Sequence, residues 1–327
     1  MHATPDGTHR FHARHAAAVA PDHARAFEGL ALSSVGIGTY LGNNDDATDA
    51  RYAQAVSRAV QLGINVIDTA INYRAQRSER AVGKAIATLA RDELVIASKA
   101  GFLPFDGQRP TDPAAYFDAT YVKTGLARKD EIVAGCHCIA PRYLADQLAR
   151  SRANLGVETI DIYYLHNPET QLDEVDRATF AARVRTAFEA LEQAVATDRI
   201  RFYGTATWSA YREPDASPTH LDLDELVALA RDVAGDRHHF RFVQLPLNSR
   251  MPEAATAPTQ RGRPLLDAAA ELGVYVMSSA SIFQGKLDAA TALAWTRTRP
   301  KLGTALVGMS HVEHVAANVT SFRRPAP

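Results

Sequence analysis

A short apolar run, a polar turn and an amphipathic segment recur eight times along this chain. This alternation builds parallel βαβ units. The predicted strands cover residues 34–38, 65–68, 94–98, 161–165, 201–205, 242–245, 274–278 and 304–307. The predicted helices cover residues 48–62, 78–89, 141–155, 183–195, 223–233, 264–272, 288–296 and 312–321. The count and spacing favour an α/β fold closed into a (β/α)8 TIM barrel over a doubly wound sheet.

The 327 residues fit one large barrel domain, because barrels of this type often exceed 250 residues as a single unit. Residues 1–23 are rich in alanine and histidine and lack a clear period, so they are predicted to be a tail that either folds over the barrel or stays mobile. Residues 24–327 are assigned to the barrel. An insert at about residues 101–140 follows the third strand and far exceeds an ordinary βα loop, which predicts a functional role for it.

Composition excludes several classes of protein. The chain is 46% hydrophobic and 22% charged with a net charge of -1, so a nucleic-acid partner is not expected. No apolar run approaches the roughly 20 residues that cross a bilayer, and the N-terminus lacks a signal-peptide core. Two cysteines are too few for a disulfide framework, so a cytoplasmic protein is expected. Monomer and small homo-oligomer both stay open.

Reactive side chains gather where three predicted strands end. Asp68 ends the second strand and Tyr73 follows it, Lys99 ends the third, and His166 ends the fourth. Active sites of such barrels lie at the carboxyl ends of the strands, so these four side chains are expected to converge. A tyrosine donates a proton more readily beside a cation, which Lys99 can supply while Asp68 holds it. His166 is expected to direct a substrate oxygen toward Tyr73.

The residues around these four positions resemble the aldo-keto reductase family. The segments are GINVIDTAINY with SERAVGKAI around Asp68 and Tyr73, SKAG around Lys99, and DIYYLHN around His166. The resemblance runs from about residue 30 to about residue 322 and is that of an atypical, bacterial-like member with a long insert. It implies an oxidoreductase that uses these four residues in catalysis and binds a nicotinamide cofactor across the barrel mouth.

The resemblance also implies cofactor contacts. VGIGTY places Thr39 and Tyr40 near the nicotinamide ribose, while QLPLN nominates Gln244 and FYGTATW nominates Ala206 and Thr207 for the carboxamide. Two later segments, SSASIFQGKL and VGMSHVEHVAANV, contribute the remaining predicted contacts, which are Ser279, Ala280, Gly285, Gly308, Met309, Ser310, His314 and Asn318.

Several of these positions depart from the family pattern. Ala206 and Thr207 stand where the family has serine and asparagine, and Ser279 stands where many members stack a tyrosine on the nicotinamide. Gly308 and His314 replace the lysine and arginine of NADPH-preferring members. Arginine suits a 2′-phosphate through its permanent charge and paired hydrogen bonds. The resemblance therefore favours NADPH and leaves NADH open.

Other features have competing interpretations. Cys136, His137 and Cys138 do not complete a structural zinc site, because four ligands are needed and no partner pair occurs in the sequence, so no metal is predicted. The insert aromatics form either a small core of their own or a substrate lid. Phe102 and Trp208 are the predicted walls of the substrate pocket.

Two functions remain under consideration. The first is reversible reduction of an aldehyde or ketone, possibly sugar-like, with Tyr73 as proton donor and a small carbonyl compound as partner. The second is a redox-inactive barrel that binds nicotinamide as a sensor or partner subunit, which fold alone does not exclude. A metal-dependent hydrolase needs more histidine and aspartate ligands at the strand ends than His166 and Asp68 provide.

Overall fold

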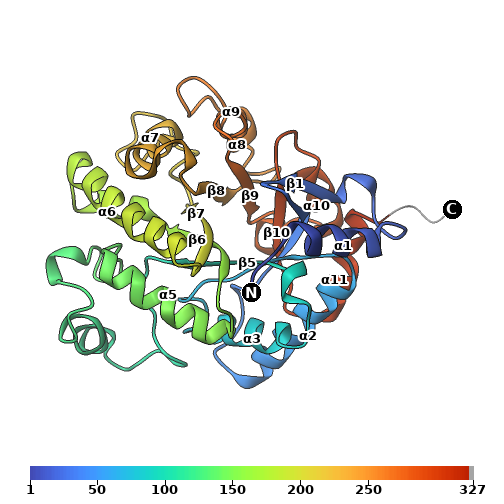
Figure 1. Cartoon of the computed structure of the whole chain (residues 1–327), viewed down its shortest axis with the longest axis horizontal. Helices are drawn as coiled ribbons and strands as arrows, with labels where there is room; N and C mark the ends of the chain where they lie inside the picture. Colours follow the sequence, from blue (N-terminus) through green and yellow to red (C-terminus); the bar gives the residue numbers. More distant parts are fainter. Residues whose placement is uncertain (324–327) are drawn as a thin grey trace.

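Eight parallel strands close into a barrel in the computed structural model, which describes residues 1–323 (Figure 1). They pair around the barrel in the order β10-β3-β4-β5-β6-β7-β8-β9. Their bounds are β3 Val35–Gly38, β4 Val66–Asp68, β5 Val95–Ala100, β6 Ile160–His166, β7 Ile200–Ala206, β8 Phe240–Pro246, β9 Tyr275–Ser279 and β10 Thr304–Gly308. The predicted (β/α)8 fold is confirmed. Residues 324–327 of the predicted domain lie outside the described residues.

Helices follow the barrel strands and cover their outer side (Figure 1). They are α2 Asp46–Gln61, α3 Arg77–Ile86, α5 Pro141–Leu155, α6 Arg177–Ala196, α7 Leu223–Ala234, α9 Leu265–Glu271, α10 Ala289–Arg297 and α11 Val312–Asn318. None of the helices in residues 1–323 is both long and apolar enough to cross a membrane.

Helix ends depart from the predicted bounds for local reasons. Helix α6 begins six residues before the predicted start at residue 183, because the Asp176 carboxylate accepts a hydrogen bond from the Thr179 amide and caps the helix there. Helix α5, by contrast, has the predicted bounds, because Pro141 occupies a first-turn position and Gly156, in the left-handed conformation (φ 66°), follows the last helical residue Leu155. Capping chemistry, rather than hydrophobic period, therefore sets these bounds.

The first 33 residues are folded against the N-terminal end of the barrel. Helix α1 (Pro5–His15) precedes a hairpin of β1 (Ala24–Phe27) and β2 (Leu30–Ser33), and neither the helix nor the hairpin was predicted. The Ala3 amide donates to Asp161 Oδ1 (2.8 Å), and Arg14 pairs with Glu93. In this structure residues 1–23 therefore lie against the barrel.

Hairpin side chains reach the apolar interior of the barrel. Leu30 and Leu32 are buried in one cluster with inward-facing residues of the strands, including Val95, Tyr164 and Phe242. Phe27 packs against the same cluster, with its ring centre 5.2 Å from that of Phe242. This end of the barrel is therefore filled, and the reactive side chains lie at the opposite, C-terminal ends of the strands.

The insert after β5 has a small aromatic core of its own. It contains α4 (Pro113–Phe117), a π-helical turn (Asp118–Val122) and a 3-10 turn (Lys129–Glu131). Phe105 stacks on Phe117 (4.9 Å) and contacts Tyr116 (5.6 Å), and Phe117 contacts Tyr121 (6.1 Å). Tyr121 in turn meets Tyr143 of α5 (5.8 Å), so the insert is fixed to the barrel's helical layer.

Strands β7 and β8 approach each other too closely for a side chain at Gly204. A Cβ atom there would lie 1.6 Å from the carbonyl oxygen of Phe242, at a register shift between the strands. Gly204→Ala is expected to destabilise the protein by about 3 kcal/mol or more, because the backbones must separate. Chemical denaturation measures this change. Gly308→Ala is the control, since a Cβ there meets nothing within 4 Å, and equal stability losses in both variants would contradict the close approach.

Candidate active site

An ion pair between Lys99 and Asp68 lies at the centre of the site. Asp68 is the last residue of β4 and Lys99 lies in the neighbouring strand β5. Lys99 Nζ donates to both carboxylate oxygens of Asp68 (2.8 and 2.7 Å) and to the Thr69 carbonyl oxygen (2.8 Å). The lysine side chain is fully buried. All three ammonium hydrogens thus have an oxygen partner, as a buried ammonium requires.

Tyr73 lies beside this pair. Its ring centre is 4.8 Å from Lys99 Nζ and 5.7 Å from the ring centre of His166, which it meets edge-on. Burial raises the pKa of Tyr73 above its ordinary value, and Lys99 offsets part of that rise. Burial also opposes the charge on Lys99, but Asp68 and Tyr73 outweigh it and raise the pKa of the lysine. Lys99 therefore eases the ionisation of Tyr73, whereas burial of the hydroxyl group has the larger and opposite effect on its pKa.

His166 ends β6 and is neutral. Burial, together with Lys99 and His137, lowers the pKa of His166 well below its ordinary value. Its Nδ1 atom is buried without a hydrogen-bond partner in residues 1–323. The ring of Phe102, at the start of the insert, meets it edge-on at 5.2 Å. A neutral imidazole can share a proton with a substrate oxygen instead of repelling Lys99.

His137 connects the insert to His166. His137 Nε2 donates to the carbonyl oxygen of His166 (2.8 Å), and His137 Nδ1 accepts from Gln171 (2.8 Å). Burial lowers the pKa of His137 to about 4. Both ring nitrogens are therefore occupied by protein groups. The Cys136–Cys138 segment is thus a structural contact behind His166. Residues 1–323 contain no cluster of side chains suited to a metal.

The predicted carboxamide contacts lie beside Asp68. Gln244 of β8 donates from its side-chain nitrogen to Asp68 Oδ1 (2.8 Å), which links the far side of the barrel to the ion pair. Thr39 donates to the Asp68 carbonyl oxygen (3.2 Å). The hydroxyl of Thr207 is buried and has no partner among the described residues. Such an unsatisfied group is suited to a polar ligand atom. Ala206, at the end of β7, contributes no side-chain hydrogen bond.

The remaining predicted cofactor positions follow β9 and β10. Ser279 ends β9 and Gly308 ends β10, so both lie at the mouth. Ala280 (φ 51°) and Gly285 (φ 81°) both have left-handed backbone, and the Ala280 carbonyl accepts from Asn248 (2.9 Å). The other predicted cofactor residues differ in exposure, since Met309 and Asn318 are buried whereas His314 is exposed. The Ser310 hydroxyl group shares a hydrogen bond with His311.

Exposed aromatic side chains flank the site. Tyr40 is 61% exposed, and its ring lies 5.0 Å from that of Tyr73. Trp208 follows β7 and is 47% exposed. Large apolar side chains are usually buried, so exposed ones at the carboxyl ends of the strands are available for contact with a ligand.

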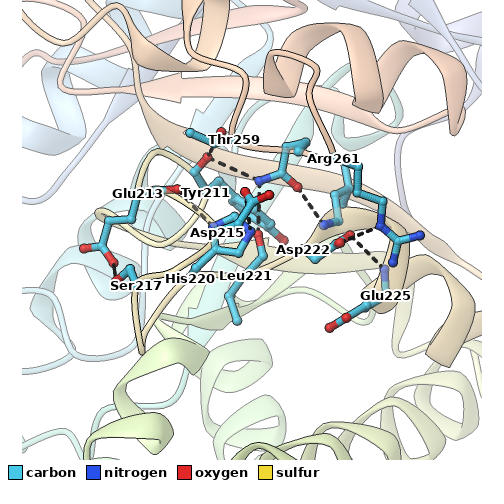
Figure 2. Close-up of polar contacts among 12 residues, drawn as sticks. Tyr211, Glu213, Asp215, Ser217, His220, Leu221, Asp222, Glu225, Thr259 and Arg261 are labelled. Carbon is cyan, nitrogen blue, oxygen red and sulfur yellow. Dashed lines mark hydrogen bonds and ion pairs between the residues drawn. The ribbon is translucent and has the colours of Figure 1, made fainter.

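The loop between β7 and α7 is fixed by its own polar contacts (Figure 2). The Glu213 carboxylate accepts hydrogen bonds from Ser217 and Thr219, and the Glu213 carbonyl accepts from His220 (3.0 Å). Thr259 donates to the Tyr211 carbonyl oxygen (2.7 Å). The chain that carries Trp208 away from the barrel is thus an ordered segment.

Sequence reasoning missed Glu169. This residue lies in a 3-10 turn (Pro168–Asp173) directly after His166, is 7% exposed, and accepts a hydrogen bond from the Trp208 amide (3.2 Å). Burial, with Glu213 and Asp173, raises the pKa of Glu169 to about 7. The sequence does place Glu169 three residues after His166, at the end of a predicted strand, and this position could have nominated it as a site residue.

A model of the aldo/keto reductase family matches residues 34–221, which contain the four catalytic candidates. The chain belongs to this family. A "Putative voltage-gated potassium channel subunit beta" of Schizosaccharomyces pombe is 25% identical over 333 residues, covering 89% of this chain and 85% of that protein. A "D-threo-aldose 1-dehydrogenase" of Pseudomonas sp. is 32% identical over 185 residues, which cover 55% of this chain and 52% of that protein.

Solved structures share the fold of this aldo/keto reductase family member. The crystal structure of an aldo/keto reductase from Klebsiella pneumoniae in complex with NADP and acetate superposes with a TM-score of 0.62 at 20% identity. The match covers 92% of this chain and 89% of that chain. The barrel and its order of elements are therefore common to both proteins.

His137 gives the protein a pH-dependent stability. Its folded pKa of about 4 lies below the ordinary 6.5, so the unfolded chain binds the proton more readily. The stability that the neutral ring supplies is present above pH 6.5 and is lost as the pH falls toward 4. Between pH 7 and pH 5 this loss amounts to about 2 kcal/mol. Urea unfolding at both pH values should show a smaller difference in His137→Gln than in the wild type. The exposed His9→Gln control should keep the wild-type difference.

Proposed function

We propose that this chain is an NAD(P)H-dependent oxidoreductase that reversibly reduces an aldehyde or ketone to an alcohol. The observation that carries the proposal is the buried Lys99–Asp68 pair directly beside the Tyr73 ring, with the neutral His166 on the ring's other edge. A tyrosine next to a fixed ammonium and a neutral histidine is suited to passing one proton to a carbonyl oxygen.

When bound, the reduced nicotinamide supplies the hydride that adds to the carbonyl carbon. Tyr73 donates its hydroxyl proton to the carbonyl oxygen as negative charge develops there, and Lys99 stabilises the tyrosinate that remains. Asp68 keeps Lys99 charged and in place, while His166 orients the oxygen by a hydrogen bond. The raised pKa of Tyr73 agrees with this role, because the tyrosine stays protonated until an alkoxide, a stronger base, takes the proton.

The residues present fit a nicotinamide cofactor. Thr207 has a buried hydroxyl in need of a partner, and Gln244 lies beside it on the next strand, so both are available to a carboxamide. The structure of the Klebsiella pneumoniae relative contains NADP, which supports the phosphorylated form. Ser310 and His314 are the proposed contacts near the 2′-phosphate, and the exposed His314, which lacks the permanent charge of an arginine, leaves NADH as a second cofactor.

The proposed substrate is a small hydroxylated or sugar-like carbonyl compound. Phe102, whose ring meets that of His166 edge-on, and the exposed Trp208 that follows β7 are the proposed apolar surfaces against which the carbon face of such a compound packs. The aldose dehydrogenase among the relatives supports this class. Cys136 and Cys138 are free thiols, which suits a reducing compartment, and we propose that the reaction takes place in the cytoplasm.

The second candidate function is a cofactor-binding subunit without turnover. It is favoured by one observation, the match over 89% of the chain to a protein named as a channel subunit. The four catalytic side chains in contact argue for chemistry instead. Substituting these four side chains one at a time distinguishes the two functions, because only an enzyme would lose turnover.

Tyr73→Phe is expected to lower kcat by about a thousandfold or more, because the proton donor is lost while the ring remains. Consumption of NADPH against a panel of aldoses and small aldehydes measures the rate. Fluorescence titration should give a cofactor Kd within about twofold of the wild type. Tyr203→Phe is the matched control and should keep kcat, because the Tyr203 ring packs against Phe188 of α6 and belongs to neither proposed binding site. Wild-type protein that binds NADPH tightly but turns over no carbonyl, with Tyr73→Phe indistinguishable from it, would support the subunit function.

His314→Arg is expected to tighten NADPH binding about tenfold and to leave NADH binding unchanged, because a permanent charge then faces the 2′-phosphate. Isothermal titration with both cofactors measures the ratio. The neighbouring exposed Glu313→Arg controls for added positive charge. Equal gains from the two substitutions would show that general charge, and not position 314, sets the preference.

A further inference from the structure

Glu169 is a buried carboxyl group at the barrel mouth that the proposed reaction does not use. Its Oε1 atom accepts one hydrogen bond, from the Trp208 amide (3.2 Å), and its Oε2 atom is buried with no partner in residues 1–323. Buried carboxyl groups usually have several partners, so one with a single contact calls for an explanation. The one contact of Glu169 is with the chain directly after strand β7.

The contact extends the strand pairing between β6 and β7 by one bond. After the last paired residues of β6 and β7, the Asn167 amide donates to the Ala206 carbonyl oxygen (2.7 Å). On the opposite edge of β7, the Thr207 amide donates to the carbonyl oxygen of Gln244 in β8 (2.8 Å). The next amide, that of Trp208, meets the Glu169 carboxyl group. A side chain thus replaces a backbone carbonyl oxygen at the point where β6 turns away.

The groups around Glu169 are mainly acidic or neutral. Asp173 lies on its own 3-10 turn, and Glu213 and Tyr211 come from the loop after β7 that Figure 2 shows. Tyr211 shares a hydrogen bond with Thr205 (2.5 Å). With burial as the main cause, these acids bring the pKa of Glu169 close to neutrality, to about 7.

We propose that Glu169 is a positioning residue that fixes the Thr207–Trp208 peptide, and thereby the Trp208 wall of the substrate pocket, more firmly when its carboxyl group is ionised. An ionised acceptor forms a shorter and stronger hydrogen bond to an amide than a neutral carboxyl group does. Trp208 is therefore held more firmly above neutral pH than below it. The effect on substrate binding rests on the proposed reductase function, whereas the effect on Trp208 does not.

The emission of Trp208 tests the contact without any turnover. The chain has two tryptophans, so Trp295→Phe leaves Trp208 as the single reporter. Its emission is expected to change from about pH 5.5 to about pH 8.5 with a midpoint near 7. Glu169→Gln in the same background should abolish that transition, because the amide keeps the shape but does not ionise. The exposed Glu189→Gln, on α6, should preserve it.

Steady-state kinetics test the consequence for the substrate. In the wild type, KM for the carbonyl compound is expected to rise several-fold as the pH falls through 7, with kcat changed less than twofold. Glu169→Gln should remove this pH dependence of KM, and Glu169→Ala should raise KM about tenfold at pH 8. A purely structural role would alter stability and kcat together and leave the pH profile in place.

Three results would overturn the proposal. One is a flat emission profile in the Trp295→Phe protein, and another is a transition with the same midpoint after Glu169→Gln. The third is a wild-type KM in Glu169→Ala. If no carbonyl compound is turned over, the proposed function fails, and the emission titration still decides whether Glu169 fixes Trp208.

Discussion

The ion pair of Lys99 and Asp68 is the interaction on which the other features of the site depend. It draws together strands β4, β5 and β8, because Asp68 also accepts from Gln244. A buried charge that loses its partner costs several kcal/mol, so each member requires the other. The pair also determines the electrostatics of its neighbours. Lys99 lowers the pKa of His166 and limits the rise that burial imposes on Tyr73.

Two carboxyl groups at the mouth have opposite surroundings. Asp68 is paired with a buried ammonium, whereas Glu169 contacts a single amide and lies near other acids. Environment, rather than residue type, therefore separates a carboxylate held in a buried ion pair from a carboxyl group whose pKa burial raises to about 7. Both lie at the carboxyl ends of strands on the same barrel rim, Asp68 at the end of β4 and Glu169 after β6, with β5 between these two strands.

The sequence predicted the barrel and the meeting of four reactive side chains at its mouth because both depend on short-range patterns. Hydrophobic period marked eight strands and helices, and the family motifs surround Asp68, Tyr73, Lys99 and His166. Features held by contacts between distant residues escaped prediction. Helix α1 has no strong apolar period and is fixed by Arg14 and Glu93, which are far apart in the chain.

The same limit applies to the site. The contact of Glu169 with Trp208 spans 39 residues, and that of His137 with His166 spans 29, so neither appears as a local motif. The pKa of Tyr73 shows a related limit of the sequence. The sequence indicated the cation beside the hydroxyl group but not the degree of burial, and burial is the larger influence on the pKa.

The folded N-terminus has a practical consequence for handling the protein. The amino group of Met1 pairs with Glu158, just before β6 begins, and Ala3 is bonded to Asp161 near the start of that strand. The chain therefore starts at the end of the barrel opposite to Tyr73 and Trp208. A fluorophore, affinity tag or solid support attached through a short spacer at residue 1 would leave the mouth facing solution. The same attachment would remove the charge of the Met1 amino group and therefore its ion pair with Glu158.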